Sequence, residues 1–214
     1  MSMDKVVLDA AHFDSKARQW DENPVFRERA ENIAAGIRAA VPLSRSMAAL
    51  DYGSGSGLLS FPLKAELGQI TLKDTSAGML AVAEEKIAAQ GVTNMVTRQA
   101  DLTADTPQDE RYDLIYSSMT LHHIPDTDAI LKTFHSLLNP GGWLCIADLD
   151  KEDGSFHGIE VEVHHGFGRE VLAEKATRAG FARPRFETVF EIVKETEQGA
   201  RAYPVFLMVA QRAG

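Results

Sequence analysis

The sequence is poor in cysteine, and its single thiol, Cys145, excludes an intramolecular disulfide and a zinc cluster built from several cysteines. No stretch approaches the roughly 18 consecutive apolar residues of a membrane span. The first residues are mixed and charged, without the apolar core of a signal peptide. We therefore expect a cytoplasmic protein with no membrane partner, and a buried, unreactive Cys145 inside the apolar run GGWLCIADLD.

Positive charge is also scarce. The chain has 22 Lys and Arg against 31 Asp and Glu, and its formal net charge is −9. Such a chain lacks the basic surface that neutralises phosphates, so we expect no nucleic acid as a general partner. The length of 214 residues suits a single domain with a full core, which we expect to span residues 1–214 as a monomer or a homodimer.

Strand and helix patterns alternate along the middle of the chain, which indicates βαβ crossovers and a mostly parallel sheet in an α/β fold. The expected strands are 47–52, 69–74, 94–101, 112–118 and 143–149, and the expected helices are 57–67, 76–91 and 125–142.

The two ends of the chain depart from this alternation. Two helices, separated at Asn23–Pro24, are expected between about residue 9 and residue 41. A helix over 168–180 precedes two strands, 185–195 and 203–212, joined by a short polar link. Strands joined in that way pair antiparallel, so the sheet is expected to end in an antiparallel hairpin.

Three glycines alternate with small polar residues in DYGSGSG, directly between a buried strand and an apolar helix. The turn contains Gly53, Gly55 and Gly57, and Ser54 lies between the first two. The glycines place no bulky side chain in this turn and permit positive φ. The first turn between a strand and a helix is where α/β sheets bind ligands. The spacing is neither the dinucleotide pattern G-x-G-x-x-G nor a P-loop. A ligand cradle is therefore favoured over a flexible surface loop.

Three acids follow three successive strands. The residues are Asp51, Asp74 and Asp101, which lie at the carboxyl ends of their strands. The carboxyl ends of parallel strands share one edge of the sheet. A carboxylate at the position of Asp74 accepts both hydroxyls of a ribose, a feature that NAD enzymes share. Asp101 can accept from the exocyclic amine of an adenine, while Leu102 offers a backbone N–H. The sequence thus predicts a nucleoside at this edge.

The ordered motifs ALDYGSGSG, LKDTSAGML, QADL, RYDLIYSSMTLHHIPD and LLNPGGWLCIAD resemble those of class I S-adenosylmethionine-dependent methyltransferases of the small-molecule type. The resemblance covers about residues 47–150. It implies a Rossmann-like three-layer sandwich with N-terminal capping helices. The corresponding parts are a helical cap (1–42), a cofactor-binding core (43–150), an acceptor-side segment (151–167), and a C-terminal helix and hairpin (168–214).

The resemblance also implies the contacts of S-adenosylmethionine. The glycine loop and its acid would hold the methionine part, the second acid and its neighbours the ribose, the third acid the adenine, and a serine after the fourth strand the methionine end. The residues that this assigns to the cofactor are Asp51, Gly53, Ser54, Gly55, Gly57, Asp74, Thr75, Met79, Asp101, Leu102, Ser117 and Ser118. The expected reaction is in-line transfer of the methyl group to a small molecule, leaving S-adenosylhomocysteine.

Two histidine pairs are the catalytic candidates, because a histidine accepts protons near neutral pH. His122 and His123 follow the fourth strand, where the alternative role is to organise a turn. His164 and His165 lie in an acidic stretch, where the alternative is a solvated loop. No metal is expected, because no pair of histidines at i and i+4 with a third ligand stands out.

Aromatic side chains are expected to cover the acceptor pocket, namely Phe13, Trp20, Phe156 and Phe167, although Trp20 equally fits a core position. Two other functions remain open at this point. One is a protein that binds S-adenosylmethionine without transferring its methyl group. The other is a nicotinamide-dependent oxidoreductase, against which the glycine spacing and Asp101 argue.

Overall fold

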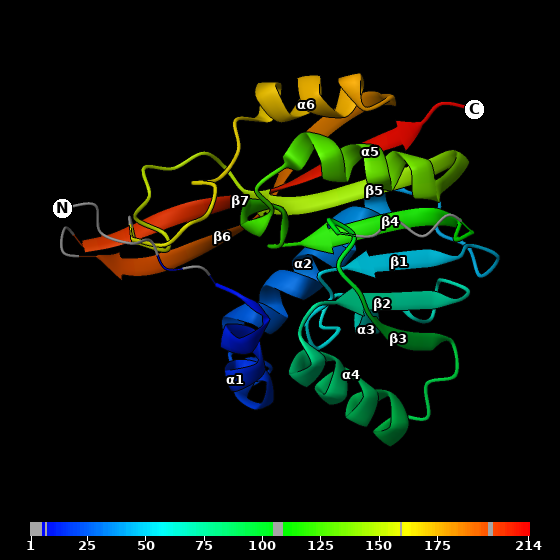
Figure 1. The fold of residues 1–214 in the computed structure, drawn as a ribbon, viewed down its shortest axis with the longest axis horizontal. Helices are drawn as coiled ribbons and strands as arrows, with labels where there is room; N and C mark the ends of the chain where they lie inside the picture. Colours follow the sequence, from blue (N-terminus) through cyan, green and yellow to red (C-terminus); the bar gives the residue numbers. More distant parts are fainter. Residues whose placement is uncertain (1–5, 7, 105–108, 159, 197–198) are drawn as a thin grey trace.

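A computed structural model describes residues 6, 8–104, 109–158, 160–196 and 199–214. Its centre is a seven-stranded sheet in the order β3-β2-β1-β4-β5-β7-β6 (Figure 1). The strands are β1 (Ala49–Tyr52), β2 (Ile70–Asp74), β3 (Met95–Gln99), β4 (Tyr112–Ser118), β5 (Leu138–Leu149), β6 (Phe181–Thr196) and β7 (Gly199–Arg212).

The sheet is parallel from β3 through β5, and β7 runs antiparallel to both β5 and β6. The predicted α/β class, with a mostly parallel sheet that ends in an antiparallel hairpin, is confirmed. The last strand of the chain, β7, inserts between β5 and β6. The chain moves outward from β1 to β3 and then returns to β4, so the strand order reverses between β1 and β4. That reversal is where open α/β sheets bind ligands.

Helices cover both faces of the sheet and complete the three layers (Figure 1). One core cluster joins the sheet to α2, α3 and α4, and the other joins it to α5 and α6. The helices are α1 (Ala10–Trp20), α2 (Pro24–Ala40), α3 (Ser60–Leu63), α4 (Ala77–Ala89), α5 (Thr127–Leu137) and α6 (Arg169–Arg178), with a 3₁₀ turn η1 (Leu121–His123). No described helix is both long and apolar enough to cross a membrane.

Successive residues of the central strands alternate between the two cores. Ala49 and Leu114 belong to the core under α2, whereas Leu50 and Ile115 belong to the core under α5. This is the period of two of a strand that is buried on both faces. Cys145 on β5 is fully buried, as predicted, and burial raises the pKa of its thiol to about 12.

Helix α4 lies within the helix expected over 76–91, whereas α3 is shorter than the helix expected over 57–67. The Ser76 hydroxyl accepts from Met79 N–H at the start of α4. After α3, the Asn94 amide donates to the carbonyls of Lys64, Leu67 and Gly68. Carbonyls held in this way are satisfied without an α-helical N–H, so the segment turns instead of continuing as a helix.

Helix α1 lies against α4, beside the edge of the sheet where β1, β2 and β4 end (Figure 1). The Asp14 carboxylate accepts from the Ser76 hydroxyl and from Gly78 N–H (2.7 Å) at the start of α4. Two turns further, Asp21 pairs with Lys86 of α4 at 2.5 Å. These acids hold α1 over the carboxyl ends of the strands.

Replacing Asp14 tests this attachment. We expect Asp14→Ala to speed amide hydrogen exchange throughout α1, because the Ser76 hydroxyl and Gly78 N–H lose their acceptor, while exchange in β1 and β4 stays unchanged. The matched control is Glu22→Ala, which removes an exposed acid just after α1. Equal exchange of α1 in the Asp14 variant and the wild type would contradict the assigned role.

Candidate functional site

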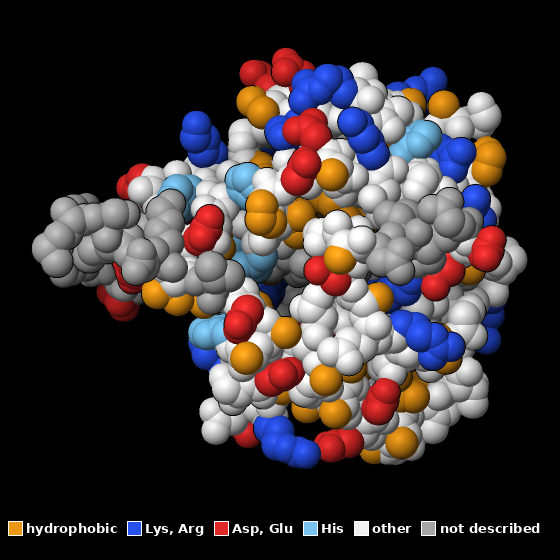
Figure 2. Space-filling model, in the orientation of Figure 1, with side chains coloured by type: hydrophobic (Ala, Val, Ile, Leu, Met, Phe, Trp, Pro, Cys, Tyr) orange, Lys and Arg blue, Asp and Glu red, His pale blue; other side chains and the backbone are white. Residues whose placement is uncertain are grey.

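A cavity of about 540 Å³ lies where the strand order reverses. Its wall is built from the segments after β1, β2, β3 and β4, and it is closed by residues of α1 and α2. On the face shown in Figure 2, histidine side chains gather beside a hollow near the middle of the molecule. The predicted site residues that line the cavity are Asp51, Gly53, Ser54, Gly55, Asp74, Thr75, Met79, Asp101, Ser118 and His123.

Two positions of the glycine loop require glycine, because each has a positive φ and no room for a Cβ. Gly53 has φ +65°, and a Cβ there would lie 2.3 Å from Thr120. Gly57 has φ +81°, and its Cβ would lie 2.8 Å from a methyl of Leu72. Gly57 does not line the cavity. It closes the turn, with its N–H donating to the Ser54 carbonyl at 2.8 Å. The loop therefore leaves bare backbone facing the cavity.

Asp74 binds the glycine loop to the start of α4. Its carboxylate accepts from Gly55 N–H at 2.7 Å and from Ser76 N–H at 2.8 Å. Burial raises the pKa of Asp74, and these backbone N–H groups act against that rise. A carboxylate has about four acceptor positions, so these bonds leave acceptor capacity for hydroxyl groups of a ligand.

Asp101 and Leu102, the predicted adenine contacts, lie differently. Asp101 lines the cavity, and its Oδ1 accepts from the N–H and the hydroxyl of Thr103 at 2.8 and 2.6 Å. These two bonds fix the carboxylate, and among the described residues no hydrogen bond reaches its other oxygen. The predicted contact of Leu102 is its backbone N–H, and its side chain packs in the core under α5.

Asp51 is the most buried of the three acids, at 1% exposure. Its Oδ2 accepts from the Ser60 hydroxyl at 2.7 Å, and that hydroxyl also lies 2.7 Å from the Tyr116 hydroxyl. Burial, reinforced by the charge of Asp74, raises the pKa of Asp51 to about 7, although the Ser60 hydrogen bond acts in the opposite direction. Asp51 thus changes charge near neutral pH.

The two serines after β4 have different environments. Ser118 lines the cavity, as expected for a contact with the methionine end. Ser117 is buried, and its hydroxyl donates to the Tyr52 carbonyl at 2.8 Å. Ser117 therefore ties β4 to the end of β1 and leaves Ser118 to face a ligand.

Of the four predicted catalytic histidines, His123 alone lines the cavity. His122 is buried behind it, with Nδ1 at 2.7 Å from Asp148 Oδ1. His164 lies beside the Ile124 carbonyl, with Nε2 at 2.9 Å from that oxygen. His165 lies near Glu152, 3.6 Å away. The structure thus brings His123 to the cavity wall, with His122 behind it, and places His164 and His165 outside the wall.

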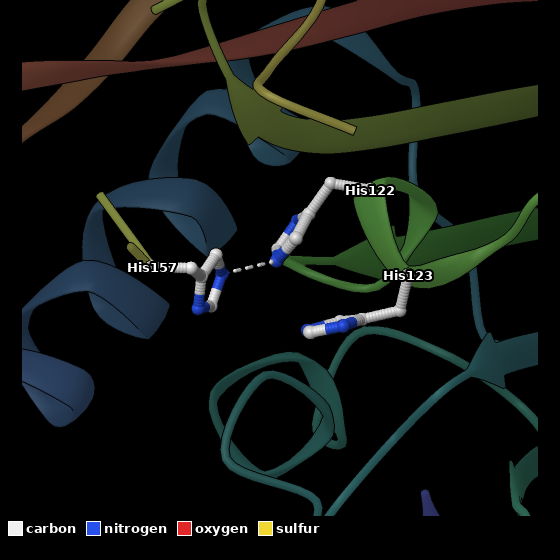
Figure 3. Close-up of side chains that lie close together, drawn as sticks. All are labelled: His122, His123 and His157. Carbon is white, nitrogen blue, oxygen red and sulfur yellow. Dashed lines mark hydrogen bonds between the residues drawn. The ribbon is translucent and has the colours of Figure 1, made fainter. Parts of the chain in front are cut away.

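A further histidine, His157, joins the first pair. Its Nε2 lies 3.0 Å from His122 Nε2, and the rings of His122 and His123 are 4.1 Å apart (Figure 3). Burial and the neighbouring histidines lower the pKa of His123 to about 3 and that of His157 to about 4. The sequence carries no spacing signal for this contact, because 35 residues separate His157 from His122.

Arg29 is the second functional candidate that the sequence did not reveal. It lies on α2, lines the cavity and is 8% exposed. Its guanidinium carbon lies 5.0 Å from the centre of the Phe26 ring. Across the ranges that the structure describes, no hydrogen-bond partner reaches this guanidinium. Burial lowers its pKa to about 10, and the charge of Asp148 opposes the change, so Arg29 stays cationic at neutral pH.

Two of the four predicted aromatic residues cover the cavity. Phe13 and Trp20 of α1 line it, and the Phe13 ring meets the His123 ring edge-on at 5.6 Å. Phe156 and Phe167 do not. Phe156 packs on Tyr203 in the core under α2. Phe167 belongs to the core under α5, so both residues contribute to core packing.

Residues 43–200 match the protein family described as "Methyltransferase domain". Two relatives each match somewhat more than half of the chain. An uncharacterized methyltransferase, C1347.09, of Schizosaccharomyces pombe is 32% identical over 119 residues, which cover 52% of this chain and 42% of the relative. The ubiquinone/menaquinone biosynthesis C-methyltransferase UbiE of Shewanella sp. strain W3-18-1 is 30% identical over 130 residues, covering 59% and 51%. The chain spans about half the length of these relatives.

Solved structures share the fold. The complex of DhpI with S-adenosylhomocysteine superposes with a TM-score of 0.72 at 24% identity, covering 96% of this chain and 95% of that one. Phosphoethanolamine N-methyltransferase 2 of Haemonchus contortus, solved with phosphomonomethylethanolamine and S-adenosylhomocysteine, gives 0.70 at 18% identity, covering 86% and 52%. With the seven-stranded sheet, its reversal of strand order and the family match over 43–200, the chain belongs to the methyltransferase domain family and has the class I methyltransferase fold.

Proposed function

We propose that this protein transfers the methyl group of S-adenosylmethionine to a small-molecule acceptor. The observation that carries the proposal is the convergence of three acids, Asp51, Asp74 and Asp101, with a bare glycine backbone on the wall of one cavity. Support also comes from neighbours of the same fold that hold S-adenosylhomocysteine. The proposal extends to the cofactor, the acceptor class and the residue roles.

The wall fits S-adenosylmethionine on its own chemistry. Asp74 keeps free acceptor positions for two ribose hydroxyls, and Asp101 keeps one oxygen for an adenine amine. The backbone at Gly53 and Gly55 lets the methionine part approach closely, because a Cβ at Gly53 would not fit. Asp51 is placed for the ammonium group of that part, with Thr75, Met79 and Ser118 completing the contact surface.

When bound, the cofactor supplies a methyl group that is already electrophilic, so the protein contributes mainly position and electrostatics. An in-line displacement requires the acceptor atom opposite the sulfur at near-attack distance. Phe13, Trp20 and Arg29 line the cavity on the side of α1 and α2. His123 is the predicted catalytic histidine on the wall, and its neutral ring can accept a hydrogen bond from the acceptor. We assign no such contact to His122, His164 or His165.

A small acceptor agrees with the size of the cavity, which must hold cofactor and acceptor together within about 540 Å³. Helices α1 and α2 cover it, so a folded protein cannot reach the interior without displacing them. One fold neighbour, the Haemonchus contortus enzyme, was solved with phosphomonomethylethanolamine, a small molecule.

The Arg29 guanidinium requires a negatively charged group of a ligand in the cavity. The Arg29 guanidinium lines the cavity with no hydrogen-bond partner among the described residues, and a carboxylate is its best-matched partner. The cofactor brings one carboxylate into the cavity, at its amino-acid end. We therefore assign Arg29 to that carboxylate, with an anionic group of the acceptor as the other source.

The ribose contact is tested by replacing Asp74. We expect Asp74→Ala to weaken binding of S-adenosylmethionine by about 1.5 to 3 kcal/mol, or about 10- to 150-fold, because hydrogen bonds to a charged acceptor are lost. Isothermal titration calorimetry gives the affinity, and Asp74→Asn keeps the size and one acceptor oxygen as the matched variant. Unchanged affinity in Asp74→Ala, or no binding to the wild type, would refute the cofactor assignment.

The raised pKa of Asp51 predicts a pH-dependent affinity. Near pH 6 most Asp51 is protonated and cannot pair with an ammonium group, whereas near pH 8 it is charged. The affinity for S-adenosylmethionine should therefore rise about tenfold from pH 6 to pH 8, with a proton released on binding. The titratable groups that act on Asp51 or contact its network are Asp74 and Tyr116, and burial keeps Tyr116 neutral by raising its pKa.

Asp51→Asn is the control for this pH series, since the amine of the cofactor titrates equally with both proteins. The difference between wild type and variant at each pH isolates Asp51. Parallel affinity curves for the two proteins would show that Asp51 does not pair with the cofactor.

The Arg29 assignment is tested with a pair of ligands. Arg29→Ala should weaken S-adenosylhomocysteine at least about tenfold, as expected for a charge-assisted hydrogen bond. Binding of 5′-methylthioadenosine, which lacks the amino-acid end, should stay unchanged. Arg29→Lys keeps the charge and should recover part of the loss. If both ligands lose affinity equally, or neither does, Arg29 does not hold the cofactor carboxylate.

A further inference from the structure

Three histidines from two distant segments meet beside the cavity. His122 and His123 form the turn η1 after β4, and His157 comes from the segment that follows β5. Their side chains point toward one common space (Figure 3). We propose that His122, His123 and His157 bind one divalent transition-metal ion, with zinc as the best match to three imidazole ligands.

The distances suit such a site. One ring nitrogen from each histidine lies within 4.8 Å of the other two. The closest recorded pair, His122 Nε2 and His157 Nε2, is 3.0 Å apart. Zinc–nitrogen bonds of about 2.0 to 2.1 Å place two ligands of a tetrahedral site about 3.3 Å apart. That pair needs to open by only a few tenths of an ångström, and rotation of the His123 side chain brings in the third ligand.

The outer partner of a metal-binding histidine is also present. Asp148 is fully buried and holds His122 Nδ1 at 2.7 Å, which leaves Nε2 of that ring as the free ligand atom. Backbone N–H groups of His122 and Leu149 donate to the same carboxylate at 3.1 and 2.7 Å. A carboxylate that orients a histidine in this way is typical of zinc sites.

The contact between His122 and His157 is then the form of the site without metal. Two imidazoles whose Nε2 atoms lie 3.0 Å apart share one proton between them. The proton on His157 Nε2 first moves to Nδ1 of the same ring. A metal ion then takes the place of that proton and binds both Nε2 atoms. The exchange requires a change of tautomer and no new charge on either ring.

The site would face the cavity on one side, because His123 belongs to both. Three protein ligands leave a coordination position open, as in catalytic zinc sites. An oxygen or sulfur atom of a cavity occupant can fill that position. Metal binding by these histidines does not require the proposed methyl transfer, so the two proposals can fail separately.

The experiment uses the full chain without a histidine tag, stripped with a chelator and titrated with zinc chloride by calorimetry. Cobalt(II) serves as the spectroscopic probe, since visible absorption bands report its coordination. We expect one ion per chain. Asp148→Asn changes an outer partner of the site, and we expect it to weaken zinc binding about 10- to 100-fold. His157→Ala removes a ligand and should weaken zinc binding by more than that.

His135→Ala is the matched control, because it removes an imidazole on α5 that is not part of the cluster. Circular dichroism establishes that each variant is folded, and His123→Ala repeats the test if His157→Ala does not fold. Binding that is lost in His157→Ala and kept in His135→Ala supports the site. No zinc binding by the wild type, or equal binding by the wild type and a folded cluster variant, overturns it.

Discussion

The parallel pairing of β1 with both β2 and β4 is the constraint on which the rest of the structure depends. Because both neighbours run in the same direction as β1, their following segments all leave the sheet at one edge. The acids after β1 and β2 and the histidines after β4 therefore surround one cavity, although they are far apart in the sequence. The reversal of strand order at this point keeps the helices on opposite faces and leaves the space between them open.

Much of this arrangement could be predicted from the sequence because it rests on local patterns. The strand Tyr112–Ser118 was predicted to the residue, since a continuous apolar run bounded by polar segments marks a doubly buried strand. The acids could be placed at one edge because parallel strands end together. In contrast, α3 proved short because the Asn94 amide, distant in sequence, takes its following carbonyls.

The parts that could not be predicted depend on contacts between distant segments without a period of their own. His157 lies in a segment with neither helical nor strand alternation, so nothing in the sequence linked it to His122. Arg29 occupies the apolar face of α2, where the pattern indicates a helix and says nothing about a buried charge. Once folded, the cavity combines Asp51, Asp74 and Asp101 on the strand side with Arg29 on the helix side, an arrangement that composition alone conceals.

Ser76 connects two parts of the molecule that were described separately. Its N–H donates to Asp74, and its hydroxyl donates to Asp14 of α1. One residue therefore touches both the carboxylate proposed for the ribose and the helix that covers the cavity. In the proposed complex with S-adenosylmethionine, lifting α1 would break a contact next to the nucleoside, which would couple the opening of this cover to the release of the nucleoside. In such an arrangement, the lifetime of the closed cover sets the upper limit on how fast spent cofactor can be exchanged.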